Sequence, residues 1–202
     1  VQGIIAGGEK ALKNSVEGAE DSDKQGANSI MEKDVNGNDV VLGISANGNA
    51  PFIHGALIES KSRGAVTGIL MCNSPMDKDY IDHVISVIVG PEVITGSTRM
   101  KAGTATKLVL NMITTTAMIK LNKTYGNLMV DLTACNDKLW DRGARIISQI
   151  TNLNYENSLK LLERADGEVK IAIVMEAIKC SKDEAKDKLN SMSGSLSQIL
   201  DH

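Results

Sequence analysis

The stretch VVLGISANGNAP, residues 40–51, decides the fold class of this sequence. Its first half, VVLGIS (40–45), is a short apolar run rich in β-branched residues, which predicts a buried strand. Its second half, SANGNAP (45–51), is a polar loop that leads into a helix expected over 52–63 and ended by Gly64. Two more strands are expected over VTGILMC (66–72) and HVISVIVG (83–90). Strands that alternate with helices predict a parallel sheet with right-handed crossovers, and hence an α/β fold.

The rest of the chain is predicted to be mainly helical. Helices are expected over 9–19, 24–33 and 99–122, and from residue 134 onward the pattern is helical throughout. Breaks fall at Asn152–Asn154, Asp166-Gly167, Ser181 and Ser193-Gly194, and Glu184 completes a capping box with Ser181. We therefore expect an α/β domain over 1–150 and a small helical domain over 151–202. The opening VQGIIAGG starts at Val1 and resembles neither a signal nor a transit peptide. Its apolar run into Gly7-Gly8 is typical of the interior of a fold, so we expect an N-terminally incomplete α/β domain.

Composition excludes several classes of protein. The 202 residues are 42% hydrophobic and 23% charged, which is typical of a globular chain and excludes an intrinsically disordered one. A net charge of -3 and 2% aromatic residues argue against a nucleic-acid partner. No apolar run has the roughly 20 residues of a membrane span, so no membrane partner is expected. Three unpaired cysteines indicate free thiols in a reducing compartment, and three scattered histidines offer no metal-ligand spacing.

The loop between the first strand and its helix is a candidate anion site. Ligands of open parallel sheets bind at the carboxyl ends of the strands, and the N–H groups at a helix start attract anions. Ser45, Asn47 and Asn49 can donate hydrogen bonds there, and Gly48 lets the backbone approach a ligand closely. An ordinary strand–helix turn would have the same composition. Because the loop is neither a P-loop nor a dinucleotide fingerprint, a nucleotide is not expected.

A second candidate loop follows the third strand, in GPEVITGSTRMK (90–101). A helix is expected to begin near Ser97, with hydroxyls from Thr95, Ser97 and Thr98 at its start. Arg99, Lys101 and Lys107 place positive charge on the first turns, where it opposes the helix dipole. A bound anion would account for these cations. Pairing with acidic side chains such as Glu92 is the alternative.

These residues together resemble one protein family. The stretch GPEVITGSTRMKAGTATK (90–107) strongly resembles a signature shared by N-acetylmuramic acid 6-phosphate etherases and the glucokinase regulatory protein. The resemblance to the etherases continues along the chain in IIAGGEKAL (4–12), VEGAEDS (16–22), GALIESKSRGA (55–65), CN (72–73), LVLNMITTTAMIKLNKTYGNLMVDL (108–132) and NDKLWDRGARI (136–146). It implies a doubly wound sugar isomerase (SIS) domain followed by a small helical region. That region resembles a ubiquitin-associated fold, and it would serve as a structural cap or as a peptide-binding module.

The resemblance also implies an activity. Etherases convert N-acetylmuramic acid 6-phosphate and water to N-acetylglucosamine 6-phosphate and D-lactate, in cytoplasmic recycling of cell-wall sugar. The implied chemistry needs no cofactor, and the implied assembly is a homodimer. A glutamate of the family's VEGAED motif corresponds to Glu20, which would be the general base; Glu17 would be a supporting group. We expect Glu20 to be partly buried. The implied phosphate contacts are Ser45, Asn47, Gly48, Asn49, Ser97, Thr98, Arg99 and Lys107.

Two departures from the family pattern bear on this interpretation. The resemblance places the general acid and a first phosphate loop before Val1. The family's SASGxTP loop is SANGNAP here, so Asn47 and Ala50 replace two hydroxyl residues. Two alternatives therefore stay open: a non-catalytic sugar-phosphate-binding regulator, and an aldose–ketose isomerase on the same fold. Either would keep a sugar phosphate as ligand, but neither would release lactate. His54 is expected to have no functional role.

Overall fold

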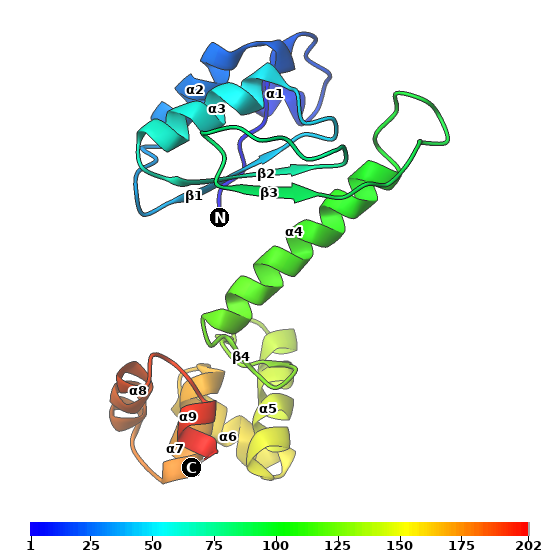
Figure 1. Cartoon of the computed structure of the whole chain (residues 1–202). Helices are drawn as coiled ribbons and strands as arrows, with labels where there is room; N and C mark the ends of the chain where they lie inside the picture. The colour runs from blue at the N-terminus through cyan, green and yellow to red at the C-terminus, as the bar shows by residue number, and fades with distance from the viewer. Residues whose placement is uncertain (202) are drawn as a thin grey trace. The chain divides into compact units, whose positions relative to one another are not determined.

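A computed structural model describes residues 1–201 (Figure 1). The chain forms two compact units, residues 1–111 and 112–202. The boundary lies within a long helix, α4 (Lys101–Lys120). No helix in the described part of the chain is long and apolar enough to cross a membrane.

The first unit is built on a parallel three-stranded sheet. Its strands are β1 (Val40–Ile44), β2 (Val66–Met71) and β3 (His83–Ser86), in the order β1-β2-β3. Two helices, α2 (Asp23–Met31) and α3 (Pro51–Ser62), pack against each other, and α3 also contacts β1 and β2 (Figure 1). The buried side chains between α3 and the sheet include Leu57, Ile69 and Met71. The predicted α/β fold with a parallel sheet is confirmed.

The glycine that ends α3 behaves as the sequence predicts. Gly64 has a φ of +83°, a left-handed conformation that favours glycine, and the next strand begins two residues later. The third strand is shorter than expected, ending at Ser86 instead of residue 90. Its partner β2 ends at Met71, so the residues after Val87 have no strand to pair with.

The helix expected over 9–19 is wrong. The structure has a one-turn helix α1 (Gly8–Ala11), turns, and a short 3-10 helix η1 (Ala19–Asp21). No residue of α1 is buried, and Leu12 is 70% exposed, so the apolar side of the expected helix has nothing to pack against. Gly18, with a φ of +69°, also interrupts a continuous helix before Glu20.

The second unit is a helical bundle with a short hairpin. The hairpin, which the sequence analysis did not expect, joins β4 (Thr124–Tyr125) to β5 (Leu128–Met129). The helices are α5 (Asp137–Thr151), α6 (Tyr155–Arg164), α7 (Val169–Ile178), α8 (Lys182–Ser191) and α9 (Ser197–Leu200). All the predicted helix breaks fall between these elements. The capping box of Ser181 and Glu184 is present at the start of α8.

One apolar core joins the parts of this bundle. Ile147 of α5, Leu162 of α6 and Ile173 of α7 are fully buried in the same cluster. Helix α5 therefore packs in the same core as the helices that follow it. The boundary between the two compact units, after residue 111, lies before the predicted domain boundary at residue 150. The division at residue 150 remains a prediction about domains.

Candidate active site

The loop after β1 is a tight turn whose two ends are hydrogen-bonded. The N–H of Ser45 donates to Leu70 of β2 over 3.1 Å, which extends the sheet pairing by one residue. The N–H of Gly48 donates to the Ser45 hydroxyl oxygen over 3.1 Å. Gly48 has a φ of +84°, and a Cβ there would lie 2.4 Å from the methyl carbon of Met71. The turn therefore needs glycine for its backbone conformation, whereas the Met71 methyl lies at the end of a flexible side chain that can move aside.

Helix α3 begins directly after this turn and has an uncapped N-terminus. Its N-cap residue, Ala50, makes no side-chain capping bond, and Pro51 has no N–H. The N–H of Phe52 donates to no group in the part of the chain that the structure describes. An uncapped helix start carries a partial positive charge and free donors, which attract an anion.

Glu20 reaches this region because two helices approach each other unusually closely. A Cβ on Gly26 of α2 would lie 1.9 Å from the carbonyl oxygen of Phe52, and one on Gly55 of α3 would lie 2.0 Å from that of Asp23. Each helix thus presents a glycine to the other's backbone. Ser22, which accepts the N–H of Gln25, caps α2 immediately after η1. The start of α2, and Glu20 just before it, therefore lie beside the start of α3.

The loop, the start of α3 and η1 surround one cavity of about 510 Å³. Five residues of the predicted site line it: Glu20, Ser45, Asn47, Asn49 and Thr98. Its other lining residues are Ile4, Ile5, Ala6, Asp21, Ile44, Ala46, Ala50, Pro51, Phe52 and Ile53. Glu17, the predicted supporting group, is not among them. The Glu20 carboxylate and the polar side chains of the 45–50 loop thus belong to residues that line the same cavity, within the first unit.

The side chain of Glu20 is exposed, which contradicts the expectation of partial burial. The neighbouring residue Ala19 is the one that turns inward, to 9% exposure, as η1 packs against α3. Glu20 is thus an exposed residue that lines the cavity.

Two of the loop's polar side chains, those of Asn47 and Ser45, keep their donors available. Asn73 donates its amide to the Oδ1 of Asn47 over 2.8 Å, which leaves the Asn47 amide N–H groups free to donate elsewhere. The Ser45 oxygen accepts from Gly48, which leaves its own O–H free. Asn47 can therefore supply the donor that the family's serine would supply.

The second candidate loop is arranged differently from the expectation. Helix α4 begins at Lys101, not near Ser97, because residues 91–100 form turns and the Glu92 carboxylate caps the helix. Its two oxygens accept the N–H groups of Lys101 and Ala102, each over 3.0 Å. These bonds lower the pKa of Glu92 below its ordinary value, the bond from Ala102 first. The anion expected at this helix start is thus a carboxylate of the chain itself.

The remaining predicted contacts do not line the cavity. Gly48 is buried inside the turn, and Ser97 is half-buried in the loop before α4. Arg99 and Lys107 are exposed, and neither makes an ion pair with any residue of 1–201. Pairing of these two cations with Glu92 is therefore not observed. Their roles in phosphate binding remain predictions.

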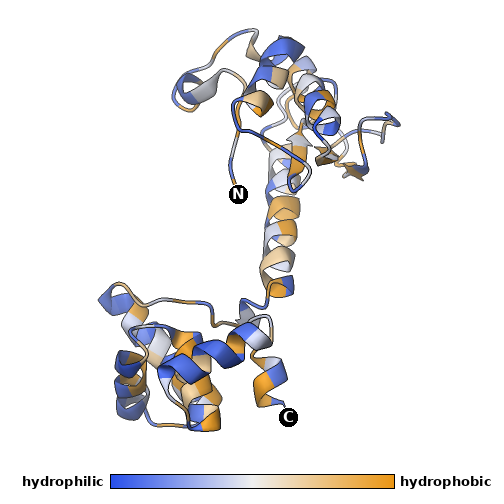
Figure 2. Ribbon diagram, turned by 90° about the vertical axis from the view of Figure 1, so that its left-hand side faces the viewer, coloured by the Kyte–Doolittle hydropathy of each residue, from blue (hydrophilic) through white to orange (hydrophobic). Residues whose placement is uncertain are grey.

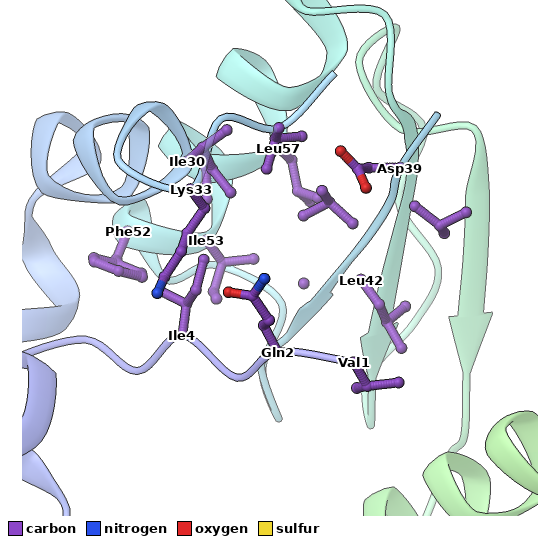
Figure 3. A pocket seen from close by; sticks show the side chains of 15 residues that line it. Val1, Gln2, Ile4, Ile30, Lys33, Asp39, Leu42, Phe52, Ile53 and Leu57 are labelled. Atoms are coloured by element: carbon purple, nitrogen blue, oxygen red, sulfur yellow. The ribbon is translucent and has the colours of Figure 1, made fainter. Parts of the chain in front are cut away.

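A second cavity, of about 320 Å³, lies along β1 and shares Ile4, Phe52 and Ile53 with the first (Figure 3). Ile30, Ile53 and Leu57 of α2 and α3 line it, together with Leu42 of β1 and the first residues of the chain. Figure 3 shows Gln2 and Lys33 beside these apolar groups. Its carboxylate, Asp39, accepts the N–H of Asn36. Because none of Ser45, Asn47 and Asn49 lines this cavity, it is the poorer candidate for sugar chemistry.

Comparison with known proteins gives the family. The family described as the N-terminal SIS domain of the glucokinase regulatory protein matches residues 1–61. The N-acetylmuramic acid 6-phosphate etherase of Shouchella clausii is 46% identical over 202 residues, covering 100% of this chain and 68% of the relative. That of Staphylococcus epidermidis is 45% identical over 199 residues, covering 98% of this chain and 68% of the relative. This chain belongs to the N-acetylmuramic acid 6-phosphate etherase family.

The etherase family membership confirms the resemblance drawn from the signature over 90–107. Etherase 1 of Bacillus licheniformis is 50% identical over 186 residues, which cover 92% of this chain and 60% of the relative. The chain thus spans about two-thirds of the length of these etherases. The SIS match and the parallel α/β sheet agree on the fold class.

The sequence pattern did not indicate the structural roles of three residues. Asn73 orients Asn47, Glu92 caps α4, and His54 bonds the Gly48 carbonyl. The one signal available for His54 was a polar residue within the otherwise apolar run PFIHGALI (51–58). Asn73 bonds a residue 26 positions earlier, and Glu92 caps residues nine and ten positions later. No local sequence pattern reveals such contacts.

Proposed function

We propose that this chain carries the phosphate-binding loop and general base of a lyase that cleaves the lactyl ether of N-acetylmuramic acid 6-phosphate. The products would be N-acetylglucosamine 6-phosphate and D-lactate. The observation that carries the proposal is the cavity that Glu20 shares with Ser45, Asn47 and Asn49. Family membership supports the same reaction, because the relatives bear the name of that activity.

The proposed mechanism is an elimination followed by addition of water. In the open-chain sugar, the aldehyde makes the C2 hydrogen acidic, and Glu20 removes it as general base. The C3–O bond then breaks, and lactate leaves with the bonding electrons and a proton from the general acid. The deprotonated general acid then activates water, which adds to C3 of the unsaturated aldehyde, and the protonated Glu20 returns a proton to C2. The family resemblance puts the general acid on a segment before Val1.

The phosphate would bind at the start of α3. The Phe52 N–H, the Ser45 hydroxyl and the Asn47 amide supply donors on one side of the cavity, and Thr98 supplies another hydroxyl. A phosphate held there places the sugar along the cavity wall toward Glu20. The reaction so described requires no cofactor.

The assembly and location follow from the same proposal. Leu108, Met112 and Ile119 lie at helical spacing on α4 and are 51%, 60% and 51% exposed. Figure 2 shows apolar residues along much of this helix. Apolar exposure of this kind supports a homodimer built on α4. Recycling of a phosphorylated sugar would place the enzyme in the cytoplasm, where the three cysteines, free among the described residues, would stay reduced.

The test is release of D-lactate from N-acetylmuramic acid 6-phosphate. It is made with the 202-residue chain and with the chain joined to the segment of the Shouchella clausii etherase that the family resemblance places before Val1. We expect lactate from the joined protein, and a loss of about 10²–10⁴-fold in Glu20→Gln, because a general base contributes that much. The matched control is Glu32→Gln, an exposed glutamate of the same unit that lies outside the cavity.

Calorimetry with N-acetylglucosamine 6-phosphate separates binding from chemistry. Binding without lactate in the joined protein would contradict the lyase and favour a regulator that binds sugar phosphates, a reading that the match over residues 1–61 would fit. Formation of a ketose phosphate would favour the isomerase. Equal lactate release by Glu20→Gln and the unmodified protein would remove Glu20 from the mechanism.

A further inference from the structure

His54, on the first turns of α3, makes two hydrogen bonds that tie the candidate phosphate loop to another part of the fold. Its Nε2 lies 2.8 Å from the carbonyl oxygen of Gly48, and its Nδ1 lies 3.1 Å from the hydroxyl of Tyr80. Because a carbonyl can only accept, Nε2 carries the proton and Nδ1 accepts from Tyr80. The two rings meet edge to face, at 87° with centroids 6.0 Å apart.

Tyr80 is itself fixed to the central strand of the sheet. The buried hydroxyl of Thr67 on β2 lies 2.8 Å from the Tyr80 carbonyl oxygen, to which it donates. Asp82 accepts the N–H of Thr67 over 2.9 Å and pairs with Lys61 of α3. Tyr80 therefore belongs to a segment anchored on both the sheet and α3, and it holds the ring of His54 in place.

The bond from His54 completes the fixation of one residue. Gly48 donates its N–H to Ser45 and gives its carbonyl to His54 alone among the residues described. The N–H and the carbonyl of Gly48, a glycine in the left-handed conformation, are thus both hydrogen-bonded. The turn on either side carries Asn47 and Asn49, which line the cavity. A change at His54 would free the Gly48 carbonyl and let these two donors move.

We propose that His54 and Tyr80 are positioning residues that set the conformation of the 45–50 loop, and through it the affinity for a sugar 6-phosphate. Neither lines the cavity, so neither is assigned contact with the ligand. The inference rests on the proposed phosphate site at this loop. Both ring nitrogens of His54 are hydrogen-bonded, one to the Gly48 carbonyl and one to the Tyr80 hydroxyl. A side chain that only filled space would not require either bond.

The test uses four variants of the chain, each made also in the joined protein described above. His54→Leu removes both bonds, and Tyr80→Phe removes the hydroxyl alone. His54→Gln keeps an N–H donor that can reach the Gly48 carbonyl. His83→Leu is the control, because His83 is an exposed histidine on β3 outside the cavity.

Three quantities are measured: the Kd for N-acetylglucosamine 6-phosphate by calorimetry, the exchange rate of the Gly48 amide by NMR, and the urea midpoint. We expect His54→Leu to raise Kd about five- to tenfold and to speed Gly48 exchange, since one lost hydrogen bond has about that effect. Tyr80→Phe should give a smaller change in the same direction. His54→Gln should stay within about twofold of the unmodified protein, and His83→Leu should match it.

The outcomes separate this inference from the proposed function. If the unmodified protein binds sugar phosphate and His54→Leu binds it equally well, the positioning role is overturned, whatever happens to the urea midpoint. If no protein binds sugar phosphate, the proposed function fails. Gly48 exchange then still decides whether His54 fixes the loop. Should His54→Leu not fold, unchanged Kd and exchange in Tyr80→Phe would overturn the inference.

Discussion

Replacing Gly55 by alanine should separate α2 from α3 and move Glu20 away from the phosphate loop. The added Cβ would lie 2.0 Å from the carbonyl oxygen of Asp23, a backbone atom that no rotamer change can displace. Carbon–oxygen contacts rarely come closer than about 3.3 Å, so the two helices must part by more than about 1 Å. A gap of that size forfeits about a quarter to a half of the dispersion energy between the facing atoms.

The net cost can be worked out from two opposing effects. Overpacking against a rigid backbone costs about 3 kcal/mol, the upper part of its usual range. Alanine in place of glycine within a helix returns about 1 kcal/mol. We therefore expect Gly55→Ala to destabilise the first unit by about 2 kcal/mol. With a typical urea dependence, the midpoint should fall by about 1 M.

The assay is hydrogen exchange with mass spectrometry, followed through urea, on peptides from α2 and α3. Trp140, the only tryptophan, packs against the core of the second unit, so its fluorescence reports on that unit in the same samples and should not change. Gly103→Ala is the matched control. Its Cβ would lie 3.6 Å from the nearest atom, so it should be neutral or slightly stabilising. Equal stability of Gly55→Ala and the unmodified chain would refute the close-contact argument.

Three further predictions concern charge and capping. The ion pair with Lys61 and a hydrogen bond from Thr67 lower the Asp82 pKa from 3.8 to about 2. The stability that ionised Asp82 gives to the fold should therefore be complete above pH 4 and disappear as the pH falls through 2. Asp82→Asn should flatten the acid limb of a circular-dichroism titration, and an unchanged limb would contradict this. Ser181→Ala should cost about 1 kcal/mol in the second unit, seen as an earlier urea transition of the tryptophan fluorescence, whereas no shift would mean that the cap is dispensable. Glu92→Ala should speed exchange of the Ala102 amide, and identical exchange would show that the cap does not form in solution.

The alternation of strands and helices over residues 40–86 was predictable because each element carries its own pattern. Val40–Ile44 and Val66–Met71 are short β-branched runs, and Gly64 stops the helix between them by its backbone conformation. The breaks of the helical bundle were predictable for the same reason, since capping residues and left-handed positions act locally. The capping box at Ser181 is one such signal.

The rest depends on partners that are remote in sequence. The pattern over 9–19 predicts a helix, but a helix so short is stable only against a packing surface, and none lies under α1. The start of α4 is set by Glu92, nine residues before Lys101. The site depends on Gly26 and Gly55, whose meeting across two helices brings Glu20 to the cavity. The motif indicated Glu20 as a candidate, but no periodicity could show that it would line the same cavity as Ser45.

The two helix starts near the site argue for one phosphate position over the other. Both follow a strand of the sheet and both were candidates from sequence, yet their N-termini differ in what already occupies them. At α4 the Glu92 carboxylate accepts two backbone N–H groups, so a phosphate there would meet a fixed negative charge. At α3 no side chain caps the helix, the Phe52 N–H has no partner among the described residues, and the adjoining turn keeps spare donors. We therefore propose α3 as the phosphate position, because an anion would meet free donors there and would share the cavity with Glu20.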